Sequence, residues 1–158
     1  MATPRALIRL LHLEDNPRAA QLVRDRLEAD HVPCEIFHVK NQAQFASAVA
    51  KRNFDMVLWD QNLPGCDGVS AIKHARKAQP NLPVIFLSGA MGDGGAAECR
   101  ALNGAGYVRK YRLQDLAPAM KAFLGRTERA VAKRAEVVEV PTRKRRTASL
   151  ALPTAAAA

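Results

Sequence analysis

The sequence predicts an α/β domain in which helices cover both faces of a parallel sheet. Two patterns alternate along the first 125 residues: short aliphatic and aromatic runs typical of buried strands, and stretches whose apolar residues recur at helical spacing. Parallel strands need crossover connections, so an alternation of five such runs with five helical stretches favours a parallel sheet. An apolar content of 48% is enough to build a core, and no apolar run is long enough to span a membrane.

The expected strands are short and rich in Leu, Ile, Val, Phe and Trp. They lie at residues 6–13, 34–39, 55–60, 83–88 and 106–110. The expected helices lie at residues 17–29, 41–51, 67–78 and 94–103, with a fifth from about 113. Pro17 suits a first helical turn, and Asp67 suits an N-cap position. Gly92, Gly94 and Gly95 weaken the start of the fourth helix, since each interior glycine costs about 1 kcal/mol relative to alanine.

Polar side chains gather at the carboxyl ends of the expected strands, where ligands bind in sheets of this type. The residues at these ends are Glu14, Asp15, Asp60, Ser88 and Lys110. A helix-capping role for Glu14 and Asp15 ahead of Pro17 is the plainer alternative. The coincidence of all these strand ends favours one shared site.

Three carboxylates at one edge of a sheet repel each other, by roughly 3 kcal/mol per pair at about 5 Å and an effective dielectric near 20. A hard divalent cation such as Mg²⁺ relieves this repulsion and also accepts phosphoryl oxygens. Lys110 and Ser88 can hold further phosphoryl oxygens. Asp60 is then the natural nucleophile, because carboxylates can form acyl phosphates.

The segments "LHLEDN", "WDQNLPGCDG", "FLSGAMG" and "GYVRK" resemble, in order and spacing, the receiver domain of two-component response regulators. The resemblance covers about residues 6–125. It is closest to receivers joined to PAS, histidine kinase or cyclic-dinucleotide signalling modules. It implies a flavodoxin-like, doubly wound five-stranded sheet of order 2-1-3-4-5 with five helices. It also implies a regulatory phosphoacceptor, which catalyses at most its own phosphorylation and dephosphorylation.

The resemblance assigns roles to the acidic residues. Asp60 would be the phosphoacceptor, with a histidine kinase, a phosphotransfer protein or a small acyl phosphate as donor. Glu14 and Asp15, together with Asp60, would hold Mg²⁺, with the backbone carbonyl of Asn62 as a further ligand.

The resemblance also implies a switch. Ser88 would be the switch hydroxyl, Lys110 the phosphate-binding lysine, and Tyr107 the aromatic residue that turns inward when Ser88 moves toward the phosphoryl group. Core packing is the alternative role for Tyr107. Asn62 and Ala90 would tune the lifetime of the phosphorylated form.

The basic character lies mostly at the end of the chain. Residues 1–125 carry 16 Lys/Arg and 12 Asp/Glu, whereas residues 126–158 carry 8 and 3. We therefore expect a receiver domain at residues 1–125, followed at residues 126–158 by a helical extension and a basic, disordered tail. The cluster from Arg143 to Arg146 lacks interleaved aromatics and a recognition helix, so we expect no specific nucleic-acid partner.

The sequence therefore favours a cytoplasmic, stand-alone receiver that signals through a face formed by its fourth helix, fifth strand and fifth helix. Its downstream partner is open, and a homodimer is one option. Two other interpretations stay open. One is a phosphorelay carrier or phosphate sink, and the other is an interaction module that works without phosphorylation.

Overall fold

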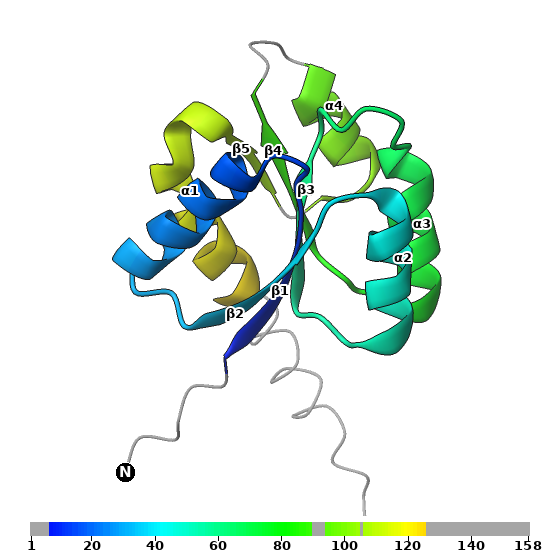
Figure 1. Ribbon diagram of the computed structural model, residues 1–158, viewed down its shortest axis with the longest axis horizontal. Helices are drawn as coiled ribbons and strands as arrows, with labels where there is room; N and C mark the ends of the chain where they lie inside the picture. The colour runs from blue at the N-terminus through cyan, green and yellow to red at the C-terminus, as the bar shows by residue number, and fades with distance from the viewer. Residues whose placement is uncertain (1–6, 90–93, 105, 126–158) are drawn as a thin grey trace, which may run out of the picture.

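A five-stranded parallel sheet forms the centre of the molecule, in the order β2-β1-β3-β4-β5 (Figure 1). The computed structural model describes residues 7–89, 94–104 and 106–125. Its strands are β1 (Ile8–Leu13), β2 (Cys34–Val39), β3 (Met56–Asp60), β4 (Val84–Ser88) and β5 (Gly106–Arg109). The predicted strand order is confirmed, and every neighbouring pair is parallel.

Five helices cover the two faces of this sheet. They are α1 (Pro17–Ala29), α2 (Gln42–Lys51), α3 (Gly68–Ala78), α4 (Gly94–Ala101) and a fifth helix at residues 116–125, which follows the 3₁₀ segment η1 (Lys110–Asp115). In Figure 1, α1 and the fifth helix lie on one side of the sheet, and α2, α3 and α4 lie on the other. Within the described ranges, no helix combines the length and apolarity needed to cross a membrane.

Side chains alternate between two apolar clusters, one on each face of the sheet. Leu11, Val57 and Phe86 join residues of α2 and α3 on one face. Leu58 and Ile85 join residues of α1 and the fifth helix on the other. Because both faces are covered, the central strands β3 and β4 are buried along their whole length. In these two central strands, polar side chains can therefore reach solvent or a ligand only at the strand ends.

Side-chain caps begin three of the helices. Asn16 accepts hydrogen bonds from the first turn of α1, and Asn41 accepts one from Gln44 N–H in α2. The predicted N-cap role of Asp67 is confirmed, because its carboxylate accepts from Ser70 N–H.

The structure corrects two predicted boundaries. The sequence predicts a fourth helix that reaches residue 103, but α4 ends at Ala101, because Asn103 adopts the left-handed conformation (φ 50°). The sequence also predicts Lys110 at the end of the fifth strand, but β5 ends at Arg109 and Lys110 opens η1. The expectations for Ala90, for Gly92 and for residues 126–158 lie outside the described residues.

Helix α1 ends in a Schellman motif with a histidine at the left-handed position. His31 has φ 53°, its N–H donates to Glu28 O, and Val32 N–H donates to Leu27 O, each at 3.0 Å. This motif usually places glycine there, because a Cβ atom is disfavoured at positive φ.

We predict that His31→Gly raises the free energy of unfolding by about 0.5–1 kcal/mol, because the relief of left-handed strain exceeds the added entropy of the unfolded chain. Urea denaturation at neutral pH measures this change. His31→Ala is the matched control, since it removes the exposed imidazole but keeps the Cβ atom. Equal stabilisation by both substitutions would show that the imidazole, and not the backbone, is responsible.

Candidate functional site

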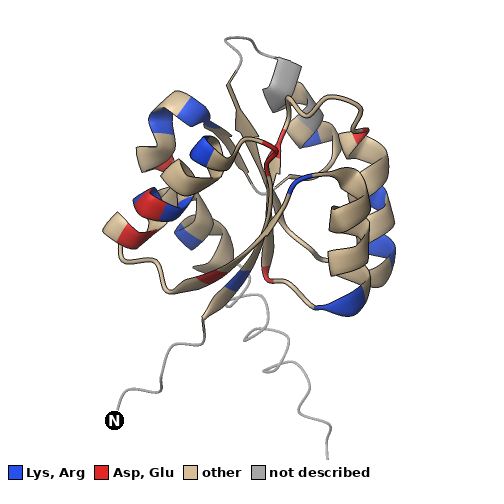
Figure 2. Ribbon diagram, in the orientation of Figure 1, with Lys and Arg blue, Asp and Glu red and all other residues tan. Residues whose placement is uncertain are grey.

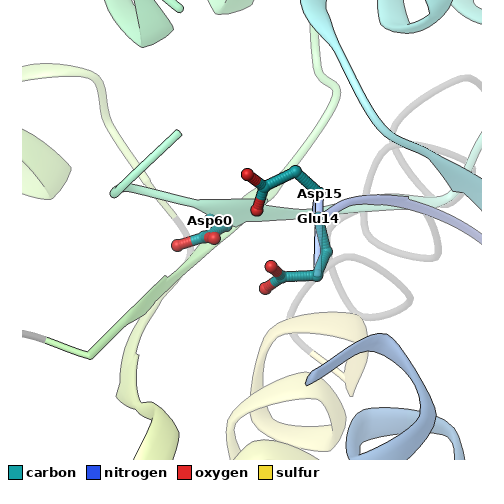
Figure 3. Close-up of side chains that lie close together, drawn as sticks. All are labelled: Glu14, Asp15 and Asp60. Atoms are coloured by element: carbon teal, nitrogen blue, oxygen red, sulfur yellow. The ribbon is translucent and has the colours of Figure 1, made fainter. Parts of the chain in front are cut away.

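Three acidic side chains converge at the carboxyl edge of the sheet. Glu14 and Asp15 follow the last residue of β1, and Asp60 is the last residue of β3. The register pairs Leu13 with Trp59, which places Glu14 beside Asp60 in the next row. Figure 3 shows the three carboxylates turned toward a common space, and each offers an oxygen within 4.8 Å of the others. The predicted acidic cluster therefore exists.

Lys110 links two of these carboxylates. Its Nζ lies 2.6 Å from Glu14 Oε2 and 2.9 Å from Asp60 Oδ2. Both acids are almost completely buried, with exposed fractions of 1% and 3%. A buried carboxylate is costly without a partner, so the ammonium group of Lys110 compensates both.

Burial and these ion pairs act in opposite directions on the pKa values. Burial raises the pKa of Glu14, although its hydrogen bonds with Lys110 and Asn16 N–H oppose this shift. Burial lowers the pKa of Lys110, but the hydrogen bonds to Glu14 and Asp60 outweigh it, and the net shift is upward. Lys110 is therefore a fixed positive charge at neutral pH.

Asn62, in the loop after β3, and the end of β4 lie next to the cluster. Asn62 N–H donates to Asp60 Oδ1 at 3.1 Å, which fixes one oxygen of that carboxylate. Ser88 is buried at the end of β4. A Cβ atom built on Gly89 would lie 3.7 Å from Asn62 Nδ2 and 3.8 Å from Lys110 Cδ. The end of β4 therefore lies beside both the Asn62 loop and Lys110.

Tyr107 lies on the sheet face that carries Trp59 and Phe86. The register aligns these three residues in one row across β3, β4 and β5. The ring of Tyr107 packs against the apolar cluster, and its buried hydroxyl has no hydrogen-bond partner among the described residues. Sequence reasoning placed Tyr107 near the site but gave no sign of this unpaired hydroxyl.

Trp59, the residue before Asp60, is a natural probe of this region. Its ring meets Phe45 edge to face, with centroids 5.0 Å apart. A Cβ atom at Gly68 would lie only 3.0 Å from Trp59 Nε1, so glycine lets the start of α3 approach the indole closely. The tryptophan therefore connects the candidate phosphoacceptor with α2 and α3.

His38 is a contributor that sequence reasoning did not assign to the site. It pairs with His12 across β1 and β2, and its Nε2 lies 2.6 Å from the backbone oxygen of Glu14. This hydrogen bond supports the turn that carries two of the carboxylates. His12 itself stays neutral, because burial lowers its pKa to about 3. The strand pairing that joins them is not readable from the chain.

The donor set fits a hard divalent cation. Three carboxylates and one lysine leave a net charge of −2 when all are ionised, and carboxylate oxygens are the ligands that Mg²⁺ prefers. Asp15 is exposed, so the cluster is open to solvent on that side. Among the described residues, this is the one group of three or more acidic, His or Cys side chains close enough to share an ion.

Comparison with known proteins points to one family. The model of the response regulator receiver domain matches residues 10–121. Transcriptional regulatory protein RprY of Bacteroides fragilis is 25% identical over 134 residues, which is 84% of this chain and 56% of RprY. Sensor protein GacS of Pseudomonas syringae pv. syringae is 33% identical over 85 residues, which is 51% of this chain but 9% of GacS. The chain therefore spans little more than half of the one relative and a small part of the other.

Solved structures share the fold. A CheY-like receiver domain protein from Methanospirillum hungatei superimposes with a TM-score of 0.69 at 20% identity, covering 79% of this chain and 99% of that one. The BeF3-activated receiver domain of DrrB, a Thermotoga maritima protein, gives a TM-score of 0.65 at 18% identity, covering 76% and 99%. With the acidic cluster and the family match over most of its length, the chain belongs to the response regulator receiver domains of two-component signalling, which are phosphoacceptor regulatory modules and not classical enzymes.

Proposed function

We propose that Asp60 accepts a phosphoryl group in a Mg²⁺-dependent reaction, and that the phosphorylated form binds a partner through a changed surface. The observation that carries this proposal is the contact of Lys110 Nζ with Asp60 Oδ2 at 2.9 Å, beside Glu14 and Asp15. This arrangement places the buried carboxylate of Asp60, the proposed nucleophile, next to the positive charge of Lys110. It also places Asp60 in a cluster of carboxylates that could bind a metal ion.

In the proposed reaction, an oxygen of Asp60 attacks the phosphorus atom of a phosphohistidine or a small acyl phosphate and forms a new P–O bond. The P–N bond of the phosphohistidine, or the P–O bond to the acyl group, breaks at the same time, so that imidazole or a carboxylate leaves. Asn62 N–H holds Oδ1 and Lys110 holds Oδ2, which orients the carboxylate. Lys110 then neutralises charge on the transferred group. Ser88, at the end of the adjacent strand, donates its hydroxyl to a phosphoryl oxygen.

Glu14, Asp15, Asp60 and the backbone carbonyl of Asn62 would hold Mg²⁺. When bound, the ion offsets the negative charge of the carboxylates and of the phosphoryl oxygens. The roles of Asn62 and Ala90 in setting the lifetime of the phosphorylated form belong to the same proposal.

The signal would leave through α4, β5 and the fifth helix. Phosphorylation adds charge beside Ser88 and favours the conformation in which Ser88 and Tyr107 are drawn toward the phosphoryl group. Tyr107 is suited to this step, because its hydroxyl has no hydrogen bond among the described residues that a reorientation of the ring would break.

A histidine kinase or phosphotransfer protein would be the donor, so the reaction would take place in the cytoplasm. Residues 126–158 would form an appendage that phosphorylation does not need.

Asp60→Asn should abolish the response to phosphoryl donors, because the amide is not a nucleophile. The measurement is Trp59 fluorescence during addition of Mg²⁺ and then beryllofluoride or acetyl phosphate. The unsubstituted chain should give a saturable, Mg²⁺-dependent change. Phosphate-affinity electrophoresis checks the same point independently of the fluorophore. If the Asp60→Asn variant still became phosphorylated, the assignment of Asp60 would be refuted.

The Lys110→Met substitution should separate the role of the Lys110 ammonium group from the role of Mg²⁺. Loss of the ammonium group should slow phosphorylation by about tenfold or more, since it removes the charge that stabilises the transferred group. Mg²⁺ affinity should be kept or increased, because a competing positive charge next to Glu14 and Asp60 is gone. Mg²⁺ titration followed by Trp59 fluorescence measures the affinity. Glu14→Gln is the matched control and should weaken Mg²⁺ binding. Equal weakening by both substitutions would contradict separate roles.

Tyr107→Ala should uncouple phosphorylation from its structural consequence. Asp60 should still be phosphorylated, but the accompanying change in amide hydrogen exchange in β5 and η1 should be lost. Tyr107→Phe keeps the ring and removes only the unpaired hydroxyl, so it should preserve the exchange change and raise the free energy of unfolding by about 1 kcal/mol. An unaltered exchange change in Tyr107→Ala, with normal onward transfer to a histidine, would favour the phosphorelay carrier.

A further inference from the structure

Strand β2 forms one edge of the sheet, and half of its backbone groups face away from the sheet. Ile8 N–H donates to Pro33 O and Glu14 N–H donates to Val39 O, so the odd-numbered residues of this segment face β1. Successive residues of a strand point their N–H and C=O groups in opposite directions. The groups of Cys34, Ile36 and His38 therefore point outward, with no strand paired to them in the described part of the chain.

Two hollows adjoin this edge on the side of α2. The larger, about 660 Å³, lies between β2 and α2 and is lined in part by Phe37, Ser47 and Lys51. The smaller, about 320 Å³, includes Arg9. Phe37 and Arg52 line both hollows, and the guanidinium of Arg52 lies 5.0 Å above the centre of the Phe37 ring. Because they share these two residues, the two hollows form one strip. Phe37, which is 37% exposed, lies at the middle of this strip.

This strip is positively charged. Arg9, Lys51 and Arg52 line it, against the single acidic residue Glu35. In Figure 2 the ribbon is blue at the C-terminal end of α2. The helix itself has no acidic residue to balance this charge. An occupant should therefore be acidic, with apolar groups that can contact Phe37.

We propose that the β2 edge binds an extended acidic segment of a partner protein as an added strand. The segment would pair with the outward groups of Cys34, Ile36 and His38, and alternate side chains would enter the strip beside Phe37 and Arg52. This site lies at the opposite edge of the sheet from β5. It therefore adds a second interaction surface and does not depend on phosphorylation of Asp60.

Other occupants fit the edge less well. Two β2 strands paired with each other would bring the cations of both copies together, which disfavours a second copy of this chain. A nucleic-acid backbone offers phosphate acceptors but not the alternating donors and acceptors that an exposed strand edge presents. A peptide strand supplies both.

The test uses the full chain and a fluorescein-labelled nonapeptide of sequence Glu-Thr-Val-Thr-Glu-Thr-Val-Thr-Glu, in which one face of the extended strand carries Glu and Val in turn. Fluorescence anisotropy at low salt should show saturable binding, and the same peptide with Lys in place of Glu should not bind. Amide hydrogen exchange of the complex, followed by NMR, should show new protection at Cys34, Ile36 and His38. Absence of binding by the acidic peptide, or protection confined to other elements, would overturn the proposal.

Matched charge reversals separate this strip from general attraction to a basic protein. Lys51→Glu/Arg52→Glu should weaken peptide binding by about tenfold or more. Lys73→Glu/Lys77→Glu makes the same change on exposed positions of α3, where Lys77 is a last-turn lysine as Lys51 is in α2, and should weaken binding less than about twofold. Thermal melts check that both variants fold. Three results would overturn the assignment of a peptide partner. They are an equal loss of peptide affinity in both double variants, protection of the β2 amides by single-stranded DNA as strong as that by the peptide, and dimerisation of the free chain through β2.

Discussion

The double ion pair of Lys110 is the interaction on which the site depends. One ammonium group compensates two nearly buried carboxylates that come from different strands, Glu14 after β1 and Asp60 in β3. Without it, the negative charges of these acids would be costly to bury, and burial already raises the pKa of Glu14. The third acid, Asp15, is exposed and has no ion pair of this kind among the described residues. The remaining negative charge makes the pocket attractive to a divalent cation.

Much of this arrangement is predictable from the sequence, because its determinants are local. Apolar runs and helical spacing locate the strands to within about two residues, and Asp67 indicates the start of α3. The rule that ligands bind at the carboxyl ends of parallel strands is then enough to predict that Glu14, Asp60 and Lys110 meet. The left-handed conformation of Asn103, which ends α4 early, is not predictable from the sequence. Asparagine tolerates this conformation but does not require it, so the tertiary structure decides whether the residue adopts it.

Other features are non-local and escape sequence reasoning. His38 reaches the Glu14 carbonyl only because β2 pairs with β1 in a register that sets His12 opposite His38. The unpaired hydroxyl of Tyr107 depends on how the row of Trp59 and Phe86 packs against α2 and α3. The strip along β2 requires residues from β1, β2 and the end of α2 to meet. In each case spacing along the chain carries no information about the contact.

The contacts at the C-terminal end of α4 limit how this helix can move relative to the sheet. The Arg76 guanidinium donates to the backbone oxygens of Leu102 and Asn103, which ties the end of α4 to α3. Cys99 Sγ donates to Gly106 O at 3.3 Å, which ties the same end to β5. A Cβ atom at Gly104 would lie 2.5 Å from Cys99 Sγ, so the connection is too tight for a side chain. If phosphorylation rearranges α4 as proposed above, the helix would therefore pivot about its C-terminal end, and the larger displacement would fall at its N-terminal end.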